Sequence, residues 1–102
     1  MKVAVMAESP NGPVSHRFAR APYILIYEVN GRVRLIEARQ NPFVVGRAAG
    51  PGVINLLAQL GVDAVVGPQP GPSAITALQQ LGIRYVPAQP GESIESALRR
   101  VI

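Results

Sequence analysis

The sequence of 102 residues contains no cysteine, no tryptophan and a single histidine. The absence of cysteine excludes a disulfide framework, a thiolate metal site and a cysteine nucleophile. One histidine cannot build a zinc site that needs several. No apolar run approaches the roughly 18 residues that span a bilayer, and the apolar stretch after Lys2 is too short for a signal peptide. We therefore expect a cytoplasmic protein that does not associate with membranes.

Glycine and proline, in contrast, are abundant, with ten of each. Such a share would suggest a disordered chain, but hydrophobic residues make up 48% of the sequence and the net charge is only +4. The chain can therefore bury a core, and we expect one domain spanning residues 1–102. Nine of the ten basic residues are arginine, which favours planar contacts with an anionic partner. A basic surface that only meets solvent would explain the charge equally well.

Hydrophobic periodicity predicts five strands and three helices in the order βββαβαβα. The strands are expected at residues 2–6, 23–29, 32–39, 64–66 and 83–86. The helices are expected to contain the apolar stripes of residues 53–60, 74–81 and 94–102, with Ser93 as the N-cap of the last. Asn30-Gly31 predicts a type I′ hairpin, so the second and third strands should be antiparallel neighbours. Charged residues along the third strand indicate an edge of the sheet.

A weak internal repeat supports two consecutive units of helix, strand and loop. Gln59-Leu-Gly61 recurs as Gln80-Leu-Gly82, and Gln69-Pro-Gly71 recurs as Gln89-Pro-Gly91, a period of about 20 residues. Two such units side by side imply parallel strands joined by right-handed crossovers. The simplest α/β arrangement is a five-stranded mixed sheet of order 3-2-1-4-5, in which only the second strand is antiparallel and helices cover both faces.

This topology brings most loops to the carboxyl-terminal edge of the sheet, where α/β proteins usually bind ligands. All ten prolines and seven glycines fall at that edge, and the other three glycines turn at the opposite edge. Helix N-termini favour anions. The residues expected to form a basic, glycine-walled binding site there are His16, Arg17, Arg20, Arg47, Gly50, Gly52 and Gly71. Alternatively, these glycines only cap helices and shape turns.

Catalytic groups are scarce in the sequence. Glu8 and Glu92 are the only acids expected at this edge, and no spacing marks them as a pair. The first strand lacks the carboxylates with which a nuclease would hold metal ions. Ser15 and His16 are adjacent, so their side chains should point apart, and no glycine elbow surrounds them. We therefore expect a protein that is not an enzyme.

The segment Val14-Ser-His-Arg-Phe-Ala-Arg-Ala-Pro-Tyr23 resembles the V-S-x-H-F-G-R-A-P-Y-F signature of the dinitrogenase iron-molybdenum cofactor biosynthesis family, which includes NifX-like, NafY-like and C-terminal NifB domains. The resemblance covers nearly the whole chain. Further matching segments are Asn41-Pro42, Gly50-Pro-Gly52, Leu60-Gly-Val-Asp63, Gly71-Pro-Ser-Ala74, and Gly91 with the Ser-Ile-Glu helix start after it. This family resemblance implies a ribonuclease H-like fold and binding of iron-molybdenum cofactor, its precursors or other metal-sulfur clusters.

One position of the signature differs in a way that affects metal binding. The histidine of the family falls at Arg17, its glycine falls at Ala19, and His16 occupies the variable position before it. A neutral imidazole can ligate iron or molybdenum and a guanidinium cannot. We expect His16 to substitute as the metal ligand from one residue away. Alternatively, Arg17 and Arg20 would hold an anionic cluster by charge, without a bond to the metal. Phe18 is better explained as a core residue than as a cluster contact.

Three hypotheses about function follow. The first is a small binding or carrier protein for an anionic metal-sulfur cluster or cofactor precursor, with cluster donor and acceptor proteins as partners. The second is a binding module for another anion, such as a phosphate-bearing metabolite, that uses the same arginines. Nucleic-acid binding is the least favoured, because the sequence contains no basic run and no recognised binding motif.

Overall fold

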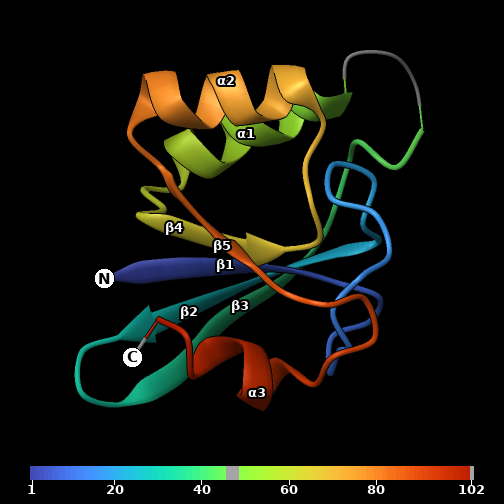
Figure 1. The fold of residues 1–102 in the computed structure, drawn as a ribbon. Coiled ribbons are helices and arrows are strands. Elements are labelled where there is room, and N and C mark those ends of the chain that lie inside the picture. Colours follow the sequence, from blue (N-terminus) through green and yellow to red (C-terminus); the bar gives the residue numbers. More distant parts are fainter. Residues whose placement is uncertain (46–48, 102) are drawn as a thin grey trace.

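A computed structural model describes residues 1–45 and 49–101 of the chain (Figure 1). Its elements are β1 (Lys2–Ala7), β2 (Tyr23–Val29), β3 (Val33–Gln40), α1 (Ala49–Gln59), β4 (Ala64–Gly67), α2 (Pro72–Leu81), β5 (Arg84–Pro87) and α3 (Ile94–Leu98). Their order is the predicted βββαβαβα.

The five strands form one mixed sheet in the order β3-β2-β1-β4-β5, which confirms the predicted topology. Strand β2 is antiparallel to β1 and β3, whereas β1, β4 and β5 run parallel. Helices α1 and α2 lie together on one face of the sheet and α3 lies on the other (Figure 1). The ribonuclease H-like label stays a prediction.

The core has two layers because both faces of the central strand are covered. Val3 and Val5 of β1 pack into the layer beneath α3, whereas Ala4 and Met6 pack into the layer beneath α1 and α2. All four side chains are fully buried. Side chains of a strand alternate between its faces, so an uninterrupted apolar run is what a doubly covered strand requires.

The hairpin between β2 and β3 differs from its prediction. Val29 pairs with Val33, so the loop contains three residues, and the predicted two-residue type I′ turn is wrong. The Asn30 N–H donates to the Arg32 carbonyl at 3.1 Å, which keeps Arg32 in the loop, and Gly31 supplies the left-handed φ of +87°. Strand β3 is an edge strand, as predicted, and a bulge shifts its register opposite Ile26 and Tyr27.

The structure fixes the start of α1 and shortens α3 relative to its prediction. Helix α1 begins at Ala49, ahead of its apolar stripe, since a proline is tolerated in the first helical turn. Helix α3 ends at Leu98 rather than running to residue 102, because the next amides bond three residues back: Arg100 to Ala97 and Val101 to Leu98. Ser93 caps this helix as expected and accepts from the Ser96 N–H. Within residues 1–45 and 49–101, no helix has the length and apolarity to cross a membrane.

Candidate functional site

A pocket of about 360 Å³ opens beside the carboxyl end of β1. We call it the basic pocket, and the described residues that line it are Glu8, His16, Arg17, Arg20, Pro22 and Val44. It thus gathers three of the residues expected from the sequence: His16, Arg17 and Arg20. Two arginines and one glutamate line it, so the charges around the pocket favour a small anion over a cation.

Ser15 holds the β1–β2 loop, residues 8–22, which carries Glu8, His16, Arg17 and Arg20. Its side chain is fully buried, and its hydroxyl donates to Glu8 Oε2 at 2.5 Å. The same hydroxyl oxygen accepts the Arg17 N–H at 3.1 Å. Ser15 therefore orients both the carboxylate and the backbone at Arg17, and its hydroxyl is engaged with Glu8 rather than with His16. The resemblance marked Ser15 as a matching residue but could not show this role.

Asn41 holds residues 19–21 of the same loop in place. This side chain is 4% exposed, and its Nδ2 donates to the carbonyls of Ala19 and Ala21 at 2.8 Å each. Its Oδ1 accepts the Phe43 N–H at 2.9 Å. Arg20 lies between the two clamped carbonyls, and its Nη1 donates to the Val44 carbonyl at 3.2 Å. Asn41 is thus a positioning residue for Arg20, a role that its place next to a proline did not reveal.

Phe18 anchors the same loop to the sheet. It is 5% exposed, which confirms it as a core residue, and its ring forms a T-shaped pair with the ring of Tyr85, with centroids 6.1 Å apart. A Cβ on Gly67 would lie 3.3 Å from the Phe18 ring, so a glycine at the end of β4 leaves room for that ring. The Tyr85 hydroxyl donates to the Gly67 carbonyl at 3.0 Å, and burial raises the pKa of Tyr85.

The predicted glycines lie elsewhere. Among the described residues that line the basic pocket there is no glycine. A Cβ on Gly52 would come within 2.5 Å of the Phe43 ring, and one on Gly50 would meet Ser73 and Ala74 of α2 at 3.7 Å. Gly52 therefore leaves room for the Phe43 ring, whereas a side chain at Gly50 would make only ordinary contacts with α2. Gly71 is the exposed N-cap of α2, with no side-chain cap bond, and Arg47 lies outside the described residues.

Glu92, the other acid of this edge, belongs to a separate network before α3. Its Oε2 accepts from Arg100 Nη1 at 2.7 Å and from the Ser96 hydroxyl, and its Oε1 accepts the Gln89 N–H at 3.0 Å. The hydrogen bonds from Arg100, Ser96 and Gln89 lower the pKa of Glu92 to about 2. These donors favour the ionised carboxylate and tie the start of α3 to its end.

This lowered pKa predicts how stability depends on pH. The ionised carboxylate stabilises the fold above the usual glutamate pKa of 4.5, and this contribution is lost as the pH falls toward about 2. We expect the melting temperature of the wild type to fall more steeply between about pH 5 and pH 2 than that of Glu92→Gln. Glu95→Gln removes a nearby exposed carboxylate, in the first turn of α3, and is the control. Parallel curves for the wild type and Glu92→Gln would contradict the assignment.

The metal-binding capacity of the described residues is limited. Across residues 1–45 and 49–101, no three histidine or acidic side chains gather as a metal ion would need. At the basic pocket, His16 could supply one imidazole and Glu8 one carboxylate. An anion bound there would be held mainly by charge and by hydrogen bonds from arginine.

Comparison with known protein families identifies the family of the chain. The sequence model of the family described as dinitrogenase iron-molybdenum cofactor matches residues 1–102. The chain belongs to this family. Membership confirms the resemblance seen at residues 14–23 and connects the chain with iron-molybdenum cofactor as the general type of cofactor. A search among curated proteins found no match.

Solved structures of similar fold come from related proteins. The chain is similar to the apo form of the orange protein from Desulfovibrio gigas, with 27% identity, a TM-score of 0.80, and 98% of this chain and 85% of that one covered. It is equally similar in sequence to a putative NifB protein from Thermotoga, with 27% identity, a TM-score of 0.76 and the same coverage. The protein PH0822 matches with 27% identity and a TM-score of 0.72 over 85% of this chain and 78% of that one.

Proposed function

We propose that the chain is a small carrier for an anionic metal-sulfur species, either a precursor of iron-molybdenum cofactor or a related cluster, and that it catalyses no reaction. The observation that carries the proposal is the convergence of His16, Arg17 and Arg20 on one pocket in a member of this family. The two guanidinium groups would donate hydrogen bonds to the anion, and the imidazole would provide the single metal ligand.

The available side chains fit temporary binding. A cluster held permanently usually has several thiolate ligands, and this chain has no cysteine. Binding by charge and by one imidazole leaves most of the cluster surface without bonds to the protein. Such a cluster could pass between a donor and an acceptor protein, which are the partners this function requires.

The similar structures support the same proposal. One was solved as an apo form and another is a putative NifB protein. Both descriptions suit proteins that hold a cofactor. Glu8 would limit the negative charge that the pocket accepts, since its carboxylate lies at the same rim as Arg17 and Arg20.

The proposal can be tested with tetrathiomolybdate, a molybdenum-sulfur dianion, under anaerobic conditions. After incubation and desalting, we expect about one molybdenum atom per chain to be retained, as measured by metal analysis. Excess inorganic phosphate should displace little of it, because sulfide and imidazole contacts favour the thiometalate. If no molybdenum is retained, the carrier function is wrong. Complete displacement by phosphate would favour a phosphate-bearing ligand instead.

A further inference from the structure

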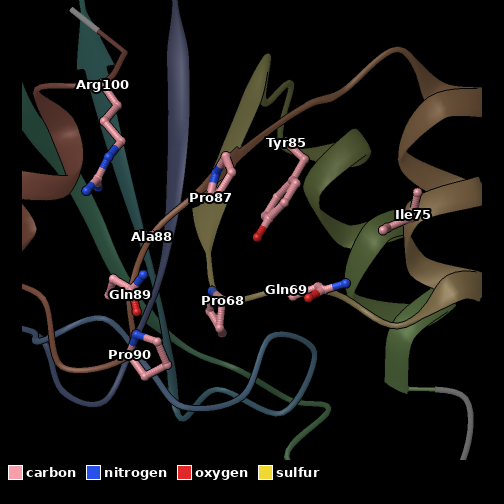
Figure 2. Close-up of a pocket in the computed structure, with 9 residues that line it drawn as sticks. All are labelled: Pro68, Gln69, Ile75, Tyr85, Pro87, Ala88, Gln89, Pro90 and Arg100. Atoms are coloured by element: carbon pink, nitrogen blue, oxygen red, sulfur yellow. The ribbon is translucent and has the colours of Figure 1, made fainter.

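A second and larger pocket lies at the carboxyl ends of β4 and β5 (Figure 2). It has a volume of about 720 Å³, and we call it the proline pocket. The described residues that line it are Pro68, Gln69, Ile75, Tyr85, Pro87, Ala88, Gln89, Pro90 and Arg100. None of these described residues also lines the basic pocket. Its volume lies in the range of about 300–1,000 Å³ that is typical of small-molecule sites.

The repeated Gln-Pro-Gly segments build two sides of this pocket. Gly67 and Pro87 are paired where β4 and β5 end. Gln69 and Gln89 each lie two residues beyond this pair. Both glutamines are exposed and both line the pocket. The internal repeat therefore brings two primary amides to one site. Each amide carries donors and an acceptor, which suits the polar edge of a planar molecule.

Most apolar side chains of the pocket have little conformational freedom. Pro68 and Ala88 are buried, whereas Pro87 and Pro90 are exposed. Proline side chains lose almost no conformational entropy when a ligand covers them. Tyr85 is also fixed, because its hydroxyl donates to a backbone carbonyl and its ring packs against Phe18. Such fixed, flat surfaces favour a flat apolar ligand that binds without reordering the pocket.

Arg100 is the only charged residue among the described residues that line the proline pocket. Its Nη1 is held by Glu92, whose other carboxylate oxygen accepts the Gln89 N–H, so the guanidinium is kept beside Gln89. The Arg100 side chain is still 43% exposed. An arginine has five N–H donors in a fixed plane, and the contact with Glu92 occupies one nitrogen. The guanidinium is thus oriented and retains donors for an acid group.

We propose that the proline pocket binds a small organic anion with a flat apolar body. Its acid group meets Arg100, its polar edge meets the amides of Gln69 and Gln89, and its body covers the prolines beside Tyr85. Figure 2 shows Gln89, Pro90 and Arg100 on one side of this space and Tyr85 and Ile75 on the other, with Pro68 and Pro87 between them. This inference does not depend on the cluster-carrier function, because the two pockets are separate.

The test uses 2-naphthoate as the anion and 2-naphthamide as an uncharged molecule of the same shape. Binding is followed by the backbone and side-chain amide signals of ¹⁵N-labelled protein. We expect 2-naphthoate to shift the signals of Gln69 and Gln89, and 2-naphthamide to bind more weakly. Arg100→Leu should weaken the binding of 2-naphthoate about fivefold to tenfold, the effect of losing one partly exposed charged hydrogen bond. Gln89→Ala should weaken it less.

The control is Arg99→Leu, which removes a neighbouring exposed arginine that does not line the pocket. This variant should bind 2-naphthoate like the wild type. The amide spectrum of each free variant shows whether its fold is intact. The proposal is overturned if millimolar 2-naphthoate leaves Gln69 and Gln89 unshifted, if it shifts the signals around His16 and Arg17 instead, or if Arg99→Leu and Arg100→Leu bind equally well.

Discussion

Replacing Asn41 by aspartate is expected to lower the free energy of unfolding by about 3–5 kcal/mol. The aspartate has nearly the same shape, but it exchanges the Nδ2 donor for an oxygen. That oxygen would face the carbonyls of Ala19 and Ala21, which now accept from Asn41 at 2.8 Å. Two carbonyls would lose their donor, and a carboxylate would be placed at a site that is 4% exposed. Urea denaturation at neutral pH measures the loss.

The matched control is Asn55→Asp, which makes the same chemical change at an exposed position of α1. We expect it to change stability by less than about 1 kcal/mol. Equal losses in the two variants would show that the hydrogen bonds of Asn41 do not hold the loop. Because Arg20 lies between the two clamped carbonyls, Asn41→Asp should also shift the amide signals of residues 19–22 more than those of α1.

Phe18→Ala is expected to destabilise the protein by about 3–5 kcal/mol. The substitution removes a ring that is 5% exposed and that packs against Tyr85 and Gly67. It leaves a cavity between the loop of residues 15–20 and the ends of β4 and β5. Chemical denaturation of the two proteins side by side gives the difference in free energy.

Phe18→Leu separates a core role from a ligand contact. Leucine keeps much of the apolar volume, so the loss of stability should be clearly smaller than for Phe18→Ala. If Phe18 only supports the loop, Phe18→Leu should also bind tetrathiomolybdate with nearly the affinity of the wild type. A stable Phe18→Leu protein that no longer binds the anion would instead place the ring in contact with it.

The sheet order could be predicted because it depends on local patterns and on general rules of connection. The hairpin at Asn30-Gly31 made two strands neighbours, and the repeated helix-strand units required parallel strands with right-handed crossovers. The exact hairpin loop and the end of α3 were wrong by a few residues. Both depend on single hydrogen bonds, such as that from Arg100 to Ala97, which no hydrophobic pattern encodes.

The site was predicted less completely than the fold. The sequence placed His16, Arg17 and Arg20 at one edge because topology alone brings their loop there. The roles of Ser15 and Asn41 could not be predicted. Both are buried polar side chains, and only the folded structure shows which groups they bond to. The packing role of Gly52 could not be predicted for a related reason. A glycine that makes room for a neighbouring ring looks the same in sequence as one that approaches a ligand.

The most direct test of the basic pocket compares two double variants with the same net charge. Arg17→Gln/Arg20→Gln removes two guanidinium groups from the pocket, and Arg32→Gln/Arg34→Gln removes two exposed ones at the hairpin on the opposite edge of the sheet. Anaerobic titration with tetrathiomolybdate gives the dissociation constant of each. We expect the pocket variant to bind at least about tenfold more weakly than the wild type, and the hairpin variant to bind with nearly unchanged affinity.

Equal weakening in both variants would mean that overall charge alone attracts the anion. Unchanged affinity in the pocket variant would mean that the anion binds elsewhere.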